Sequence, residues 1–153
     1  MKTLLVYYSE DERIKSLCRK SESKKIATCE LRDLSGSSLF KRKLSVITGG
    51  HSSVSECNFD LNEFDSVIFA SDGMFGGLAP AMISFIKTAD LHNKKVYGVV
   101  FGDRKSAQRA TDTFRTSVSL SGGTAEAVVT VPVKAFKRCE EDVICFVRHR
   151  IAV

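Results

Sequence analysis

The sequence predicts an α/β domain in which a parallel sheet is covered by helices on both faces. Its 153 residues are enough for one hydrophobic core. Short apolar runs of strand length alternate along the chain with longer stretches whose apolar residues recur at helical spacing. Strands that are apolar throughout must be buried on both faces. We therefore expect residues 1–153 to form a single domain, a three-layer α/β/α sandwich with a five-stranded parallel sheet.

The first half of the chain is predicted to hold two strands and two helices. Leu4–Tyr8 is an apolar run that predicts a buried strand, and residues 12–20 have the apolar spacing of a helix. Ile26–Leu31 predicts the second strand. Residues 38–47 predict a short helix that ends at a pair of glycines suited to a C-terminal cap, and residues 51–62 are polar and predict a loop.

The second half is predicted to alternate three strands with three helices. The strands are expected at Ser66–Ala70, Lys95–Phe101 and Ala125–Val131, and the helices at residues 80–89, 104–119 and about 137–150. A glycine-bearing loop, Asp72–Pro80, is expected to join the third strand to its helix. Gly122 and Gly123 are expected to end the long helix, and Pro132 the last strand.

Composition argues against several classes of function. No apolar run has the length of a bilayer span, and the chain enters its first strand without the apolar stretch of a signal peptide. We therefore expect a cytoplasmic protein with no membrane partner. The net charge is +5, but the basic residues lack interleaved aromatic residues and no nucleic-acid motif accompanies them. No nucleic-acid partner is expected.

The five cysteines predict free, mostly buried thiols in a reducing compartment, because their number is odd and none forms a C-x-x-C pair. Cys18, Cys139 and Cys145 have the spacing of residues on the buried faces of helices, so we expect them to pack in the core. The three histidines show no ligand spacing with any cysteine, and no metal site is predicted.

The candidate binding site follows from the expected sheet. In an open parallel sheet, ligands bind outside the carboxyl ends of the strands where the strand order reverses. For the order 2-1-3-4-5, the relevant loops are Ser9–Arg13, Asp72–Gly77 and Gly102–Ser106. The first is unusual, because Glu10–Glu12 is wholly acidic where backbone N–H groups and a helix dipole usually receive a phosphate.

These elements resemble the flavodoxin-like family over most of the chain. The resemblance rests on Leu4–Tyr8, Glu30–Leu34, Phe64–Phe69, Gly76–Ile86 and Leu91–Val96. It is most specific after the third strand, where the family has a loop with an aromatic residue and glycine. A helix that begins at proline and a strand entry of the Gly-Lys-Lys-Val type follow in the family. Residues 36–50 are also similar to the longer bacterial flavodoxin-like chains, which carry extra residues before the third strand.

The resemblance implies non-covalent FMN, held by three loops and used for electron transfer. The FMN phosphate would bind the first loop, and the flavin ring would lie between the other two. The cofactor-binding residues that the resemblance implies are Ser9, Glu10, Asp11, Glu12, Arg13, Ile14, Asp72, Gly73, Met74, Phe75, Gly76, Gly102 and Asp103. The cofactor would carry the chemistry, so no catalytic acid–base residues are expected.

Two of the loops depart from the family pattern. Residues 10–14 replace a Gly-Thr-Gly-Asn-Thr type run, and their carboxylates would repel a phosphate dianion, although Arg13 could reach one. Met74 and Phe75 stand where the family often has a Pro-x-Trp element, and the chain has no tryptophan. We therefore predict an electron-transfer flavoprotein whose FMN binding is weak or lost. The alternative is an FMN-free binding or regulatory module, and either would act with a redox or regulatory protein partner.

The acidic turn has two further interpretations. Acidic side chains at a helix N-terminus satisfy its unpaired N–H groups and contribute about 0.5–2 kcal/mol, so Asp11 or Glu12 could itself occupy the anion position. A more distant alternative is a receiver-like phospho-acceptor, with Glu10 and Asp11 binding Mg²⁺, Asp72 as acceptor and Lys134 beside it. The length of the segment 36–62 argues against the receiver.

Overall fold

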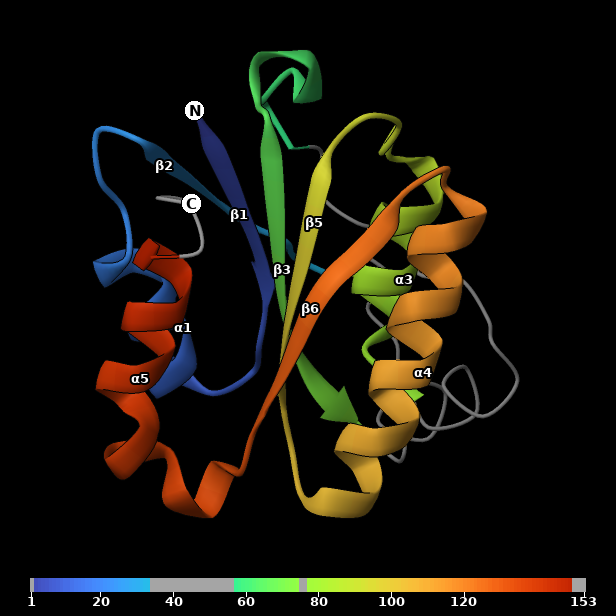
Figure 1. Cartoon of the computed structure of the whole chain (residues 1–153). Coiled ribbons are helices and arrows are strands. Elements are labelled where there is room, and N and C mark those ends of the chain that lie inside the picture. The colour runs from blue at the N-terminus through green and yellow to red at the C-terminus, as the bar shows by residue number, and fades with distance from the viewer. Residues whose placement is uncertain (1, 34–56, 75–76, 150–153) are drawn as a thin grey trace.

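A computed structural model shows a twisted parallel sheet with helices on both faces (Figure 1). The structure describes residues 2–33, 57–74 and 77–149. The helix predicted at 38–47 and the first half of the loop predicted at 51–62 lie outside these ranges.

The predicted strands and helices within the described ranges are confirmed, with small shifts of their ends. The strands are β1 (Thr3–Tyr8), β2 (Ile26–Glu30), β3 (Ser66–Met74), β4 (Gly77–Leu78), β5 (Lys95–Phe101) and β6 (Thr124–Val131). The helices are α1 (Glu12–Lys20), α3 (Pro80–Thr88), α4 (Arg104–Leu120) and α5 (Phe136–His149), with short 3-10 turns at Leu61–Glu63 and Val133–Ala135. None of the helices within the described ranges is long and apolar enough to cross a membrane.

The main sheet has the order β2-β1-β3-β5-β6, and all of its pairings are parallel. This confirms the predicted order 2-1-3-4-5, since β5 and β6 are the fourth and fifth of the predicted strands. β3 lies in the middle of the sheet between β1 and β5. The turn after β1 and the end of β3 therefore lie next to one another.

The predicted loop at Asp72–Pro80 is wrong in its first half. β3 continues through Met74, and Gly73 and Met74 pair with the short antiparallel strand β4. The strand continues because β5 supplies a partner for each residue as far as Asp72, which pairs with Phe101. Backbone pairing of this kind overrides the local turn preference of glycine.

The two faces of the sheet bury separate cores. Helices α1 and α5 cover one face, and α3 and α4 cover the other (Figure 1). Along β1 the side chains alternate: Leu5 and Tyr7 pack with α1 and α5, whereas Leu4 and Val6 pack with α3 and α4. A strand buried on both faces explains why its sequence is continuously apolar.

The cysteine predictions for the helices hold in part. Cys18 is buried on the inner face of α1, but Cys139 is only half-buried and Cys145 is exposed. The prediction for Cys145 is wrong because α5 buries the face that carries Val143 and Val147, and Cys145 lies on its other side.

Candidate functional site

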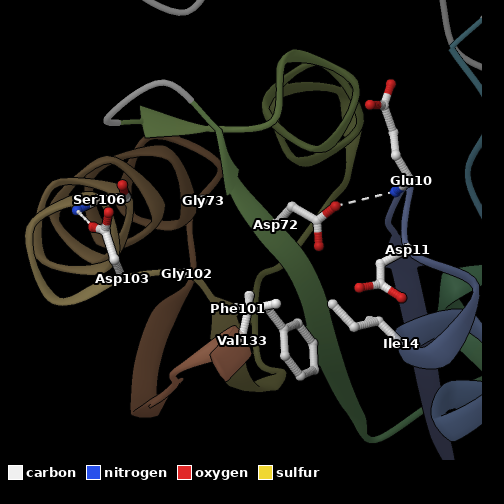
Figure 2. Close-up of a pocket in the computed structure, with 10 residues that line it drawn as sticks. All are labelled: Glu10, Asp11, Ile14, Asp72, Gly73, Phe101, Gly102, Asp103, Ser106 and Val133. Atoms are coloured by element: carbon white, nitrogen blue, oxygen red, sulfur yellow. Dashed lines mark hydrogen bonds between the residues drawn. The ribbon is translucent and has the colours of Figure 1, made fainter. Parts of the chain in front are cut away.

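An open cavity of about 590 Å³ lies at the carboxyl ends of β1, β3 and β5 (Figure 2). We call it the carboxyl-edge cavity. It is lined by Glu10, Asp11, Ile14, Asp72, Gly73, Phe101, Gly102, Asp103, Ser106 and Val133. These residues come from the turn after β1, the end of β3, the turn between β5 and α4, and the segment that follows β6.

The fold brings residues of all three predicted loops to this cavity. The predicted site residues that line it are Glu10, Asp11, Ile14, Asp72, Gly73, Gly102 and Asp103. Ser9 is buried beside them, whereas Glu12 and Arg13 do not line the cavity. Phe75, Gly76 and the side chain of Met74 lie outside the described part of the chain.

The Asp72 carboxylate joins the end of β3 to the turn after β1. Its Oδ2 accepts a hydrogen bond of 3.0 Å from the Ser9 hydroxyl and another of 3.0 Å from the backbone N–H of Glu10. Figure 2 shows the carboxylate pointing across the cavity to Glu10. Burial raises the pKa of Asp72, and the nearby Asp11 and Glu10 carboxylates raise it further. Its Oδ1 is buried and has no hydrogen-bond partner among the described residues.

Asp11 is the N-cap of α1. Its Oδ1 accepts a hydrogen bond of 2.9 Å from the backbone N–H of Arg13, and its carboxylate also binds the Arg13 guanidinium, with 3.0 Å between Nε and Oδ1. The hydrogen bond from the Arg13 side chain holds the pKa of Asp11 below its usual value. The backbone N–H of Asp11 donates to the Ser9 hydroxyl at 2.9 Å. The prediction that an acidic side chain of this turn caps the helix is confirmed for Asp11.

Arg13 and Glu12 serve other contacts. The Arg13 guanidinium is bound to Asp11 and lies 5.7 Å from the centre of the Phe136 ring in α5, a cation–π distance. Glu12 pairs with Lys15 at 3.1 Å on the surface of α1. The cation that was expected to reach a phosphate is therefore engaged between α1 and α5, outside the carboxyl-edge cavity.

The third loop closes the other side of the cavity. Asp103 is the N-cap of α4 and accepts a hydrogen bond of 2.8 Å from the backbone N–H of Ser106. Gly73 lies close to this helix, since a Cβ built on it would meet the Ser106 carbonyl oxygen at 3.5 Å. This is an ordinary van der Waals distance, so the end of β3 packs directly against α4.

Two lining residues lie outside the predicted loops: Phe101 is the last residue of β5, and Val133 follows β6. Ser106, in the first turn of α4, ends the predicted third loop but was not among the predicted cofactor-binding residues. Phe101 could have been found from its place at a strand end. Val133 could have been found in the same way, because the predicted order places the end of the fifth strand, here β6, at the same edge.

The acidic residues and the donors of the turn do not fit a phosphate dianion. Carboxylates from Glu10, Asp11, Asp72 and Asp103 surround the cavity, whose apolar lining is Ile14, Phe101 and Val133. The backbone N–H groups of Glu10, Asp11 and Arg13 already donate to atoms of the chain itself. The arrangement suits a ligand with an apolar part and a neutral or cationic polar part. Within the described ranges, no group of three histidine, cysteine or acidic residues is placed to hold a metal ion.

Comparison with solved structures gives the fold a known counterpart. The chain superposes on the flavoprotein from Lactobacillus acidophilus NCFM in complex with FMN with a TM-score of 0.72 and 19% identity, over 84% of this chain and 92% of that one. The chain has a flavodoxin-like fold. The apo-form of the same Lactobacillus flavoprotein gives a TM-score of 0.69 at 18% identity, covering 89% of this flavodoxin-like chain and 95% of the other.

The oxidised form of Flavodoxin 1 from Bacillus cereus gives a lower TM-score of 0.58 at 13% identity. The superposition covers 97% of this flavodoxin-like chain and 99% of the Bacillus cereus chain. No protein-family model matches the sequence, and no curated protein matches it. The structural likeness therefore supports the fold, and the function of this flavodoxin-like chain must be argued from its own residues.

Proposed function

We propose that this protein is a flavodoxin-fold binding module whose carboxyl-edge cavity binds FMN weakly or not at all. One observation carries the proposal: the Asp72 carboxylate accepts hydrogen bonds from the Ser9 hydroxyl and from the Glu10 backbone N–H. Both groups are donors in the turn where a phosphate would dock. A buried carboxylate in this position both repels an incoming anion and uses the donors that the anion would need.

The electrostatic penalty is large enough to decide affinity. Two unit charges 4 Å apart interact by about 1 kcal/mol in water and by about 4 kcal/mol at the effective dielectric near a protein surface. A phosphate dianion would face the Asp72 carboxylate, whereas the Asp11 carboxylate is already paired with the Arg13 guanidinium. Since about 1.4 kcal/mol changes a dissociation constant tenfold, the charge on Asp72 is enough to weaken the binding of a phosphorylated flavin about tenfold or more.

A second candidate function is FMN-linked electron transfer. It is favoured by the likeness to a flavoprotein whose solved structure contains FMN and by a cavity at the sheet edge where such folds bind ligands. In either case we propose a redox or regulatory protein partner. The net charge of +5 favours an acidic surface on that partner.

Titration with two flavins distinguishes these functions. FMN and riboflavin share the isoalloxazine ring, and riboflavin lacks the phosphate, so their ratio of dissociation constants isolates the phosphate contribution. Flavin fluorescence is followed as protein is added. We expect riboflavin to bind at least as tightly as FMN. FMN binding that is tenfold or more tighter than riboflavin binding would contradict the proposal and support electron transfer.

The substitution Asp72→Asn tests the proposed cause. It keeps an oxygen acceptor for the Ser9 hydroxyl and the Glu10 N–H but removes the charge. We expect the dissociation constant for FMN to fall about tenfold and that for riboflavin to change little. The matched control is Asp142→Asn, which makes the same charge change on the exposed side of α5, away from the cavity. An equal gain for both variants would show that only net charge matters.

A further inference from the structure

An exposed thiol and an imidazole lie together near the C-terminal end of α5. All five cysteines lie within the described residues, and Cys145 is the only one of them that is exposed. Its Sγ lies 3.2 Å from Nδ1 of His149, which is four residues further along the helix and is also exposed. Residues four apart are neighbours on the surface of a helix, so α5 itself holds the two side chains together. Neither residue lines the carboxyl-edge cavity.

The hydrogen bonds of His149 give this contact a direction. Nδ1 of the ring also lies 3.0 Å from the backbone carbonyl oxygen of Cys145. A carbonyl oxygen can only accept a hydrogen bond, so Nδ1 is assigned the proton and donates it. The Cys145 sulfur then faces the same N–H as a second acceptor. A donor is therefore in place for a sulfur that becomes negatively charged during a reaction.

Charged neighbours of both signs flank the sulfur on α5. Arg148 follows Cys145 by three residues, whereas Asp142 and Glu141 precede it by three and four residues, and all three are exposed. Exposed charges of opposite sign largely offset one another and are screened by salt. The N–H of His149, rather than the net charge of this surface, is therefore the contact that can assist chemistry at Cys145.

We propose that Cys145 is a site of reversible S-thiolation, at which the sulfur reacts with a low-molecular-weight disulfide while His149 holds and stabilises it. The proposal is independent of flavin binding. It stands on the exposure of the sulfur and on its contact of 3.2 Å with the ring nitrogen. Thiol–disulfide exchange needs an anionic sulfur that a disulfide can reach, and a hydrogen bond donated to that anion favours the reaction.

The chemistry balances with oxidised glutathione as the disulfide. The Cys145 thiol gives its proton to solvent, and its sulfur attacks one sulfur of the disulfide. A new S–S bond joins Cys145 to one glutathione, while the other glutathione leaves with the electron pair of the broken S–S bond and takes up a proton. Cys145 is thereby oxidised and the departing glutathione is reduced. A dithiol reductant reverses the step, and the Cys145 sulfur then leaves as a thiolate beside the His149 N–H.

A purely structural role for His149 predicts the opposite effect on the rate. A histidine in the last turn of a helix caps it by donating to a carbonyl oxygen there. The loss of such a cap would loosen the end of α5 and expose Cys145 further, so modification would be unchanged or faster. Under the proposal, His149→Ala should instead slow modification of Cys145 about three- to tenfold, as expected for the loss of one hydrogen bond to the reacting atom.

The test follows the modification of the full chain over time. The protein is incubated with oxidised glutathione, free thiols are alkylated at intervals, and non-reducing peptide mapping by mass spectrometry locates the adducts. We expect the glutathione adduct at Cys145 to form before any adduct at Cys139, the half-buried cysteine of the same helix. A dithiol reductant should remove the adduct, and Cys145→Ser should abolish it.

Two further variants test the role of the ring nitrogen. His149→Asn places an amide nitrogen at the position of Nδ1, so it should retain most of the rate that His149→Ala loses. His92→Ala is the matched control, because it removes another exposed histidine in the turn before β5 and should leave the rate unchanged. Equal or faster modification in His149→Ala would overturn the proposal. An adduct that forms first on another cysteine, or a disulfide between Cys145 of two copies instead of the adduct, would also overturn it.

Discussion

Asp11 occupies the position where an anion would bind at the start of α1, and its removal gives a quantitative test. In Asp11→Ala, the backbone N–H of Arg13 loses its acceptor at 2.9 Å, and the Arg13 guanidinium loses its carboxylate partner. Loss of an N-cap costs about 1 kcal/mol, within a range of about 0.5–2 kcal/mol. The exposed ion pair adds a few tenths. We therefore expect the free energy of unfolding to fall by about 1–2 kcal/mol at neutral pH.

The pH dependence of this loss has a defined sign. The hydrogen bond from Arg13 lowers the pKa of Asp11 in the folded protein. The stabilisation is therefore fully present above the unfolded carboxyl pKa of about 4 and disappears as the pH falls through the lower folded value. The difference between the unmodified protein and Asp11→Ala should shrink in acid.

Urea unfolding followed by circular dichroism measures this difference, provided that the denaturant slope stays constant. Asp11→Asn is the matched control, because asparagine caps a helix without a charge and should cost only a few tenths of a kcal/mol. Asp103→Ala removes the equivalent cap of α4 and should cost about 1 kcal/mol.

Added inorganic phosphate completes the test. Removing Asp11 frees an N–H group at the positive end of the α1 dipole, so phosphate should raise the urea midpoint of Asp11→Ala more than that of the unmodified protein. Equal stability of the two proteins, or an equal response to phosphate, would refute the view that Asp11 fills the anion position.

Three further predictions concern single substitutions at Asp72, Gly98 and Gly122. Asp72→Asn should stabilise the fold at pH 7, because burial penalises the charged form of Asp72 and so raises its pKa. Urea unfolding at several pH values should show this gain decreasing as the pH falls and absent below the unfolded carboxyl pKa of about 4. Gly98→Ala should lower the free energy of unfolding by about 1–3 kcal/mol, since the added Cβ would lie 2.7 Å from the fully buried ring of Phe114. Adding Phe114→Leu should recover part of this loss, because the smaller side chain leaves room for the Cβ. Gly122→Ala should lower the free energy of unfolding by about 1–2 kcal/mol, because the φ of Gly122 is +80° and the added Cβ would meet the exposed His92 ring. Adding His92→Ala should remove only the contact with the ring, so thermal unfolding of the double variant should still show the cost of the backbone strain.

Local patterns predicted which segments form strands and helices and where most helices end, whereas the sheet order followed from topology rules for alternating strands and helices. α1 begins after Asp11, as expected for an acidic cap, and the alternation of strands and helices left few arrangements. The extension of β3 through Met74 was missed because it depends on pairing with β5 and β4, which no local pattern records.

Under the proposed function, one side chain changes the ligand class of the carboxyl-edge cavity while the fold stays the same. β1 and β3 are neighbours in register, with Tyr8 opposite Ser71, so the next residue of β3 necessarily lies beside the turn after β1. That residue is Asp72, and its carboxylate reaches the Glu10 N–H at 3.0 Å. The strand order that places the turn after β1 beside the third strand also allows an acid on that strand to occupy the donors of the turn. The proposal therefore predicts that fold and phosphate recognition separate at this position, and the flavin titrations of Asp72→Asn measure that separation.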